Sequence, residues 1–304
     1  MEDVIVVGGS FAGLSAATYL ARARRRVLVF DTGRPRNRLS VHSHGVLALD
    51  GERGSDLLRI ARTQLVKYPT ARQMTADVHR VARRKEEPAF EVETRKGDRY
   101  AARRLILATG LEDQLPEIPG LGERWGRSVF HCPYCDGYEF APGPIGVLAT
   151  VPQSVHFAEI VADWGALTLF TNSALTVDAE GRERLTRRGI RLVEDRVAAL
   201  EGSADGRLER IRMERGTTVA IRALFIATLY RQAAPFARDL GCEIVENPRG
   251  QLVKTDESKQ TTVPGVYAAG DMARPTHSIP FAAADGATAG TSAHQSLVTQ
   301  ERQA

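Results

Sequence analysis

The stretch Val6–Gly13 (VVGGSFAG) decides the fold of this chain. A β-branched run precedes it, and the segment 14–22 after it has the apolar spacing of a helix. A dinucleotide-binding fold needs a tight glycine turn here, so that backbone N–H groups and the helix N-terminus approach a pyrophosphate. Gly8 serves the turn, Gly13 lets the helix pack on the strand, and Ser10 leaves room where a middle glycine is usual. The pattern predicts a strand–turn–helix unit that binds a dinucleotide.

An acidic residue supports this interpretation. Asp31 follows the next predicted strand, 26–30, about 20 residues after the glycine turn. A carboxylate at that strand end accepts hydrogen bonds from the ribose hydroxyls of a dinucleotide. An ordinary strand–helix turn is the alternative, and Asp31 makes it the weaker one.

Two later elements indicate which dinucleotide is bound. The run Thr262–Asp271 (TVPGVYAAGD) is an apolar strand that delivers Gly-Asp to its C-terminal end, where the Asp is suited to bond a ribityl chain. An earlier strand, 104–108, closes on Ala-Thr-Gly. Three separated elements of one cofactor site predict FAD.

The stretch His131–Glu139 (HCPYCDGYE) carries a pair of thiols. A Cys-X-X-Cys spacing closes a disulfide with little backbone movement and lowers the pKa of one thiol, which makes a thiolate nucleophile available. Asp136 adds an acid/base group within reach of either sulfur. A structural zinc site has too few ligands, since Cys242 and His131 are the only further obvious candidates. Glutaredoxins share the Cys-Pro-Tyr-Cys run, but they are much shorter chains. A purely structural disulfide is a further alternative, and such disulfides are rare in the cytosol.

Over essentially its full length, the chain resembles the thioredoxin reductase family of flavoproteins. The FAD turn, Ala-Thr-Gly, Cys-X-X-Cys-Asp-Gly and Pro-Gly-Val-Tyr-Ala-Ala-Gly-Asp occur in family order. The resemblance implies a homodimer in which Cys135 faces the flavin, Cys132 attacks the partner disulfide or thiol, and Asp136 handles protons.

The expected fold class is α/β, with two Rossmann-like, three-layer domains. Residues 1–115 and 246–304 form the predicted FAD domain, and 116–245 form an inserted pyridine-nucleotide-type domain that carries the dithiol. In the insert we expect strands at 145–149, 166–170, 190–193 and 223–227, and a helix at 155–164. A last helix is expected at about 287–298.

The inserted domain departs from the family at its own nucleotide turn. The turn 149–154 reads Ala-Thr-Val-Pro-Gln-Ser and holds no glycine. Val151 obstructs the approach of a pyrophosphate, and Pro152 removes a backbone donor. The segment 171–174 lacks an Arg for a 2′-phosphate. These changes predict an enzyme that does not use NADPH as ordinary thioredoxin reductases do.

Other departures indicate a branch of the family. The segment 36–51 together with Gly137–Glu139 resembles the branch that contains the dithiol oxidases of holomycin and gliotoxin biosynthesis. The family's Arg-Gln-Ala, which lies near the flavin, appears here as His277-Ser278-Ile279. His44 and His131 are candidates for proton transfer, because histidine titrates near neutrality, or for packed or cofactor-bonding side chains.

The residues expected to contact FAD come from the glycine turn, the ribose acid, the segments near 38–44 and 78, and the two later strand ends. They are Gly8, Ser10, Phe11, Ala12, Gly13, Asp31, Arg38, His44, Val78, Ala108, Thr109, Gly110, Gly270 and Asp271. The expected catalytic residues are Cys132, Cys135 and Asp136, and no metal site is expected. Cys242 is expected to be a small buried core residue.

Composition excludes several classes of function. Basic and acidic residues number 41 and 37, and no run combines clustered Lys/Arg with stacking aromatics, which argues against nucleic acid. No apolar stretch has the length of a membrane span, and no secretory signal precedes the first strand. Three cysteines in 304 residues fit a cytoplasmic protein.

The sequence therefore predicts an FAD-dependent thiol–disulfide oxidoreductase that is not NADPH-dependent. It either oxidises a dithiol with oxygen as acceptor or reduces a disulfide with electrons from ferredoxin or a second flavin. The substrate is a small dithiol or disulfide, or a thioredoxin-like protein. A conventional NADPH-dependent thioredoxin reductase and a non-catalytic redox-sensing flavoprotein are the alternatives.

Overall fold

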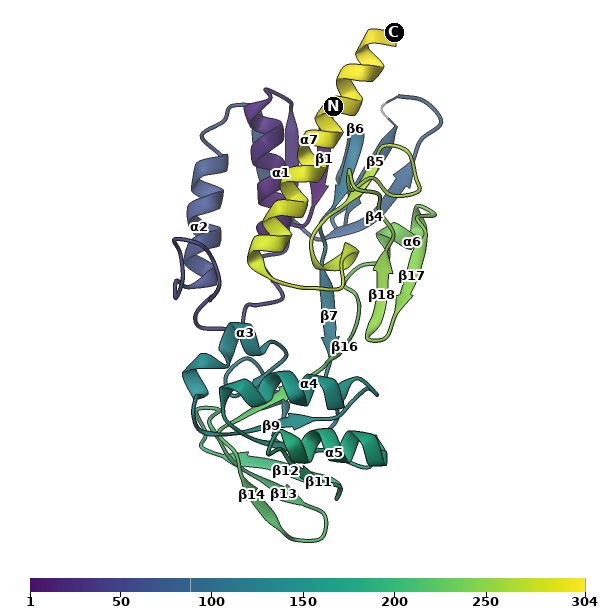
Figure 1. Ribbon diagram of the computed structural model, residues 1–304. Helices are drawn as coiled ribbons and strands as arrows, with labels where there is room; N and C mark the ends of the chain where they lie inside the picture. The colour runs from purple at the N-terminus through teal and green to yellow at the C-terminus, as the bar shows by residue number, and fades with distance from the viewer. Residues whose placement is uncertain (88, 304) are drawn as a thin grey trace. The chain divides into compact units, whose positions relative to one another are not determined.

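The computed structural model describes residues 1–87 and 89–303 and divides the chain into two compact units (Figure 1). The first unit comprises Met1–Arg38, Gly54–Glu112 and Arg231–Ala304, and the second comprises Leu39–Arg53 and Asp113–Tyr230. Among the described residues, no helix is long and apolar enough to cross a membrane.

The helices and strands of the first unit, with the two connecting strands β7 and β16, have the following bounds: β1 (Glu2–Val7), α1 (Phe11–Arg22), β2 (Val27–Asp31), α2 (Gly54–Leu65), β3 (Ala71–Thr75), β4 (Val78–Arg83), β5 (Phe90–Thr94), β6 (Arg99–Leu107), β7 (Leu111–Gln114), β16 (Leu229–Gln232), α6 (Phe236–Asp239), β17 (Ile244–Asn247), β18 (Gly250–Val253), β19 (Val266–Ala268), η4 (Asp271–Ala273) and α7 (Ile279–Gln303).

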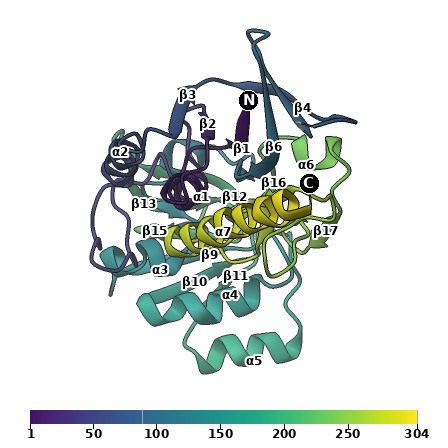
Figure 2. The same cartoon turned by 90° about the horizontal axis from the view of Figure 1, so that it is seen from above.

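A seven-stranded sheet forms the centre of the first unit. Strands β3, β2, β1, β6 and β19 are parallel neighbours, while β5 and β4 continue the sheet antiparallel from the start of β6. Helices α1 and α7 run side by side (Figures 1 and 2). Their backbones touch, because a Cβ on Gly286 would lie 2.0 Å from the Ala12 carbonyl oxygen. Apolar residues of β1 and β2 pack with α1 and α7 in one buried cluster.

The last helix is longer than the sequence led us to expect, because it begins at Ile279 rather than near 287. The Ser278 hydroxyl accepts a hydrogen bond from the Phe281 backbone N–H at 3.3 Å and caps the helix there. Pro280 is tolerated in the first turn, where its missing N–H has no helical partner.

The second unit contains the following elements: η1 (Gly122–Arg124), β8 (Val129–Phe130), α3 (Pro133–Asp136), η2 (Tyr138–Phe140), β9 (Pro144–Leu148), α4 (Ser154–Val161), η3 (Ala162–Trp164), β10 (Ala166–Phe170), α5 (Ala179–Arg187), β11 (Arg191–Val193), β12 (Val197–Gly202), β13 (Leu208–Met213), β14 (Thr218–Ala220) and β15 (Ala223–Ile226).

A parallel sheet with the order β11-β10-β9-β15-β8 forms its centre and has two covered faces. Alternate side chains separate the faces: Val147, Leu169 and Phe225 pack with α4 and α5, whereas Leu148 and Phe170 pack with the sheet β12-β13-β14. Figure 2 shows α4 and α5 on the same side of this sheet. The expected α/β class with two three-layer units is therefore confirmed.

The two units divide at Glu112/Asp113 and at Tyr230/Arg231, whereas the sequence led us to expect linkers near 115 and 245. The later difference arises because α6, β17 and β18 associate with the first unit. Cys242, for example, donates its thiol to Thr261 Oγ1 at 3.4 Å and is buried, as expected for a core residue. The assignment of Leu39–Arg53 to the second unit has no counterpart in the expected boundaries.

Candidate functional site

The dithiol lies at the start of a one-turn helix in the second unit. Strand β8 leads into Cys132, which occupies the N-cap position of α3, and Pro133 takes the first helical position, where proline is favoured. Helical geometry brings the Cys135 backbone N–H to 3.3 Å from the Cys132 carbonyl oxygen. The two Cα atoms are 5.3 Å apart, and Cys132 and Cys135 form a disulfide.

Aromatic side chains hold this segment in place. Trp164 stands edge-on to the Tyr134 ring, with the ring centres 5.2 Å apart. A Cβ on Gly137 would lie 2.5 Å from the Pro133 carbonyl oxygen and 2.8 Å from the Trp164 ring, so this position requires glycine. The His131 ring lies 6.0 Å from that of Trp125. The His131 ring thus lies near the Trp125 ring, at the residue that precedes Cys132.

Asp136 has an unusual proton affinity. Burial, and secondly the negative charge of Glu139, raise the pKa of Asp136 to about 7, while His44 opposes the shift. A carboxyl group with that pKa exists in both protonation states near neutrality. Asp136 is therefore suited to accept and return protons beside the two sulfurs.

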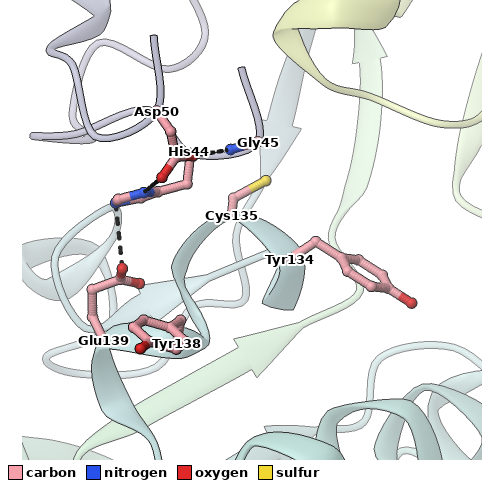
Figure 3. Close-up of a pocket in the computed structure, with 7 residues that line it drawn as sticks. All are labelled: His44, Gly45, Asp50, Tyr134, Cys135, Tyr138 and Glu139. Atoms are coloured by element: carbon pink, nitrogen blue, oxygen red, sulfur yellow. Dashed lines mark hydrogen bonds and ion pairs between the residues drawn. The ribbon is translucent and has the colours of Figure 1, made fainter. Parts of the chain in front are cut away.

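An open pocket of about 290 Å³ adjoins the disulfide within the second unit. Its lining consists of His44, Gly45, Asp50, Tyr134, Cys135, Tyr138 and Glu139 (Figure 3). Tyr134 and Tyr138 are 74% and 83% exposed, so each ring meets solvent on most of its surface. Sequence reasoning did not single out Asp50, Glu139 or either tyrosine as a site residue. Their approach depends on the 39–53 segment folding onto α3, for which the sequence carries no local signal.

The glycine turn of the first unit passes the steric test for a bound dinucleotide. A Cβ on Gly8, which has a φ of +112°, would lie 2.1 Å from the Ala108 carbonyl oxygen and 3.1 Å from the Thr109 N. A Cβ on Gly13 would lie 1.8 Å from the Gly8 carbonyl oxygen. Ser10 occupies the N-cap position of α1, but its side chain forms no hydrogen bond with the first amides of this 12-residue helix. The turn and the Ala-Thr-Gly run therefore form a close backbone cradle that fits a pyrophosphate.

Asp31, the acid predicted to bind the ribose, has a basic partner that sequence reasoning missed. Asp31 accepts a hydrogen bond from the Gly33 N at 3.0 Å and an ion pair from Arg62 on α2 at 2.7 Å. A Cβ on Gly9 would lie 2.6 Å from the Asp31 Cβ, so the acid packs directly on the glycine turn. An Arg that follows an Asp by about 30 residues forms no recognisable sequence motif, because only the docking of α2 brings the two side chains together.

At the second predicted FAD element, Asp271 pairs with Arg36 at 2.9 Å. Arg36 also lies 2.8 Å from the Nδ1 of His277, whose Nε2 lies 2.9 Å from the Arg274 carbonyl oxygen. Burial lowers the pKa of His277 to about 4, a net shift that the negative charge of Asp271 opposes and the positive charge of Arg36 assists. His277 is therefore neutral near pH 7, with Nδ1 accepting from Arg36 and Nε2–H donating to the carbonyl.

The remaining predicted FAD residues are distributed as follows. Phe11 and Ala12 begin α1, and Gly270 lies beside Ala12. Thr109 Oγ1 donates to the Met272 Sδ at 3.5 Å, and Gly110 follows it at a φ of +72°. Val78 begins β4 and is buried, whereas Arg38 is exposed and donates to the Pro35 carbonyl oxygen at 3.4 Å. His44 lies in the second unit, beside Cys135.

The corresponding turn of the second unit is filled by the chain itself. Ser154 Oγ accepts hydrogen bonds from the backbone N–H groups of Thr150 at 3.2 Å and Val151 at 3.3 Å. The Thr150 hydroxyl donates to the Ala227 carbonyl oxygen at 2.7 Å. Both Val151 and Ser154 are buried. The amides that a nucleotide phosphate would use are therefore already paired.

The turn after β10 is likewise a closed structural element. Asn172 and Ser173 adopt left-handed φ values of 52° and 53°. The Asn172 Oδ1 accepts a hydrogen bond from the Val197 backbone N–H at 2.8 Å, which ties this turn to β12. The turn compared above with a 2′-phosphate site is thus tied into the fold by an amide side chain.

Comparisons with known proteins agree with these features. The family model described as pyridine nucleotide-disulphide oxidoreductase matches residues 2–289. Thioredoxin reductase tcpT of Claviceps purpurea is 33% identical over 97% of this chain and 94% of its own length. An oxidoreductase from Agrobacterium tumefaciens, known from its crystal structure, is 43% identical, with a TM-score of 0.93 over 98% of this chain and 99% of that one. The crystal structure of HlmI matches at 36% identity and a TM-score of 0.93, over 99% of this chain and 94% of that one.

Proposed function

The chain belongs to the pyridine nucleotide-disulphide oxidoreductase family, and on that premise we propose that it oxidises small dithiols without using NADPH. Its membership makes it an FAD-binding disulfide oxidoreductase that resembles thioredoxin reductases. The direction of electron flow and the identity of the electron partners are the proposed part.

The self-filled turn at Thr150–Ser154 is the observation that supports the proposal. To bind NADPH there, a phosphate would have to displace the Ser154 hydroxyl from two amides and move the buried Val151 side chain. The segment 171–174 offers no Arg for the 2′-phosphate. One lost charge-assisted hydrogen bond costs about 1.5–3 kcal/mol. When the cost of opening the turn is added, the loss of binding free energy is about 4 kcal/mol, which corresponds to roughly a thousandfold weaker binding of NADPH.

In the first unit, by contrast, no side-chain cap from Ser10 pairs the first amides of α1. Gly8, Gly13 and the N-terminus of α1 would hold the FAD pyrophosphate, Asp31 its adenosine ribose and Asp271 its ribityl chain. Bound FAD supplies a two-electron acceptor that oxygen then reoxidises.

The Cys132/Cys135 disulfide performs the exchange chemistry. A substrate thiolate attacks the Cys132 sulfur, which forms a mixed disulfide and releases the Cys135 thiolate. The second substrate thiol then attacks the substrate sulfur of the mixed disulfide, so that substrate leaves as a disulfide and Cys132 as a thiolate. Asp136 accepts and returns protons during these steps. With FAD bound, the reduced Cys132/Cys135 pair would give up two electrons to it as the disulfide re-forms.

A second candidate function is the reduction of a thioredoxin-like protein. The name of the Claviceps purpurea relative favours it, and its electrons would come from NADPH or from a non-pyridine donor such as ferredoxin or a second flavin. A homodimer is proposed for either function and is tested by light scattering of the purified protein.

Anaerobic titration of the yellow protein with NADPH, NADH and dithiothreitol, followed at the flavin absorbance, separates the functions. Dithiol oxidation requires rapid bleaching by dithiothreitol and oxygen consumption when air is admitted. Rapid, saturable bleaching by micromolar NADPH would instead identify a conventional reductase. An enzyme that neither bleaches with a dithiol nor consumes oxygen would contradict the proposal.

A further inference from the structure

An arginine from α2 contacts the acid that ends β2. Arg62 Nη2 lies 2.7 Å from Asp31 Oδ2, and the same nitrogen lies 3.5 Å from the Gly9 carbonyl oxygen in the glycine turn. In the described part of the chain Arg62 has no other hydrogen-bond partner, and its buried Nε has none. The guanidinium therefore serves the acid and the turn rather than a wider network.

The docking of α2 does not depend on this arginine. Helix α2 lies beside α1 (Figures 1 and 2) and is held by Leu57, Leu58 and Leu65, which are buried. Leu58 and Leu65 belong to the cluster that also contains residues of β1, β2 and α1. The side chain of Arg62 is 33% exposed, and an ion pair with that much solvent contact contributes little to folding. Folding alone therefore gives little reason for the pair.

The hydrogen bonds to Asp31 leave the acceptor positions that a ribose requires. A carboxylate offers about four such positions, shared between its oxygens. In this protein Oδ1 accepts from the Gly33 backbone N–H at 3.0 Å and Oδ2 accepts from Arg62. Roughly two positions remain, which suffice for the 2′- and 3′-hydroxyl groups of the adenosine ribose of FAD. Arg62 therefore does not compete with the ribose for the acid.

The charge of Asp31 also needs a partner. A Cβ on Gly9 would lie 3.0 Å from Asp31 Oδ2, so this oxygen lies against the turn that is expected to hold the FAD pyrophosphate. A carboxylate and a pyrophosphate carry like charges, and bringing them together disfavours binding. The positive charge of Arg62 offsets that of the acid. Asp31 can then accept from the ribose without repelling the pyrophosphate.

We propose that Arg62 is a positioning residue for FAD, which holds the Asp31 carboxylate toward the adenosine ribose and neutralises its charge beside the pyrophosphate. Arg62 acts through Asp31 and not by binding the cofactor itself. The proposal rests on the role expected of Asp31, and it applies whichever way electrons flow through the flavin.

The affinity for FAD tests this without any measurement of turnover. Equilibrium dialysis of the holoenzyme against a series of FAD concentrations gives Kd for wild type and variants. Arg62→Met should bind FAD roughly tenfold more weakly, because the acid loses its orientation and its counter-charge. Arg62→Lys keeps the charge and should recover part of the affinity. Arg59→Met is the matched control and should bind FAD as wild type does, since Arg59 lies one turn earlier on α2, is 67% exposed and pairs with Asp56.

A double-mutant cycle shows whether Arg62 acts through Asp31. Asp31→Ala alone should weaken FAD binding. Adding Arg62→Met to Asp31→Ala should weaken it no further, because the group that Arg62 positions is already gone. In the Asp271→Asn background, by contrast, Arg62→Met should keep its full effect, since Asp271 pairs with Arg36. The FAD analogue that lacks the adenosine 2′-hydroxyl gives a readout that a general loss of structure would not: Arg62→Met should discriminate less than wild type between FAD and this analogue.

Three results would overturn the proposal. If Arg62→Met binds FAD as tightly as wild type, or more tightly, the arginine is idle or competes with the ribose. If Arg62→Met weakens binding equally in the Asp31→Ala background, or leaves the discrimination between FAD and the analogue unchanged, it acts elsewhere than through the acid. If Asp31→Ala itself binds FAD normally, the role expected of Asp31 is wrong and the role of Arg62 falls with it.

Discussion

Ser154 accepts, through its hydroxyl oxygen, a hydrogen bond from the backbone N–H of Val151 at 3.3 Å, within the turn where a nucleotide-binding domain would hold a phosphate. The same oxygen accepts from Thr150, so one buried side chain pairs two amides. A loop built to bind phosphate leaves such amides free, and this one uses them in its own fold.

From that arrangement we expect NADPH to be a poor reductant of the flavin. Micromolar NADPH should leave the absorbance of the oxidised flavin unchanged over minutes, whereas dithiothreitol bleaches it during mixing. Ser154→Ala should lower the free energy of unfolding by about 1–3 kcal/mol, because the amides of Thr150 and Val151 lose their acceptor. It should not make NADPH effective, since Val151 still fills the turn. Denaturant titration and stopped-flow spectroscopy check both statements, and saturable reduction of the wild type by NADPH would refute the first.

Gly8→Ala should abolish or strongly weaken FAD binding. The added methyl group would lie 2.1 Å from the Ala108 carbonyl oxygen, so the cradle has to open to accommodate it. Gly33→Ala is the matched control, because Gly33 also has a positive φ but a Cβ added there would have nothing within 4 Å. The ratio of flavin to protein absorbance in the purified variants measures the difference. Equal FAD content in the two variants would show that the cradle does not contact the cofactor.

Cys132→Ser and Cys135→Ser should each abolish turnover, because exchange passes through a mixed disulfide that the second sulfur resolves. Cys132→Ser should leave a thiolate against the flavin, visible as a long-wavelength charge-transfer band. Cys242→Ala is the control, since that thiol is buried and bonded to Thr261. If the band arises in Cys135→Ser instead, the roles of the two sulfurs are reversed.

The rate of flavin reduction by a dithiol should rise with pH through the pKa of Asp136, which burial and the charge of Glu139 bring to about 7. Asp136→Asn should remove this rise and slow the reaction roughly a hundredfold at pH 7. The same shift affects stability. Because the pKa of the folded protein exceeds the usual value of 3.8, the unfolded state ionises first, and stability falls as the pH rises from about 4 to about 7. Asp136→Asn should therefore be more stable than wild type at pH 8 by urea titration and lose that advantage below pH 4.

The backbone cradle and the dithiol were predictable from the sequence because their demands are local. The turn at Gly8 tolerates no side chain, and Cys132 and Cys135 meet through a spacing that one helical turn imposes. The absence of glycine at Val151 is likewise visible in the sequence. The hydrogen bonds that the Ser154 hydroxyl accepts from two backbone amides are visible only in the structure.

The partners of these groups were not predictable, since they come from distant segments. Arg62 reaches Asp31 through the docking of α2, and no sequence motif links the two residues. Glu139 meets His44 only because the 39–53 segment associates with the second unit. The sheet β12-β13-β14 was missed as well, because its strands alternate buried and exposed residues over short runs that carry no functional motif.

The two tryptophans of the chain flank the dithiol segment, with Trp125 against His131 on one side of Cys132 and Trp164 against Tyr134 on the other. Indole emission responds to the polarity and to the quenching groups of its immediate surroundings, and here those surroundings are the residues next to the two sulfurs. The protein therefore carries an optical reporter of its own dithiol. A change in tryptophan fluorescence on cleavage of the disulfide would therefore report exchange at the sulfurs directly, without any measurement of the flavin absorbance.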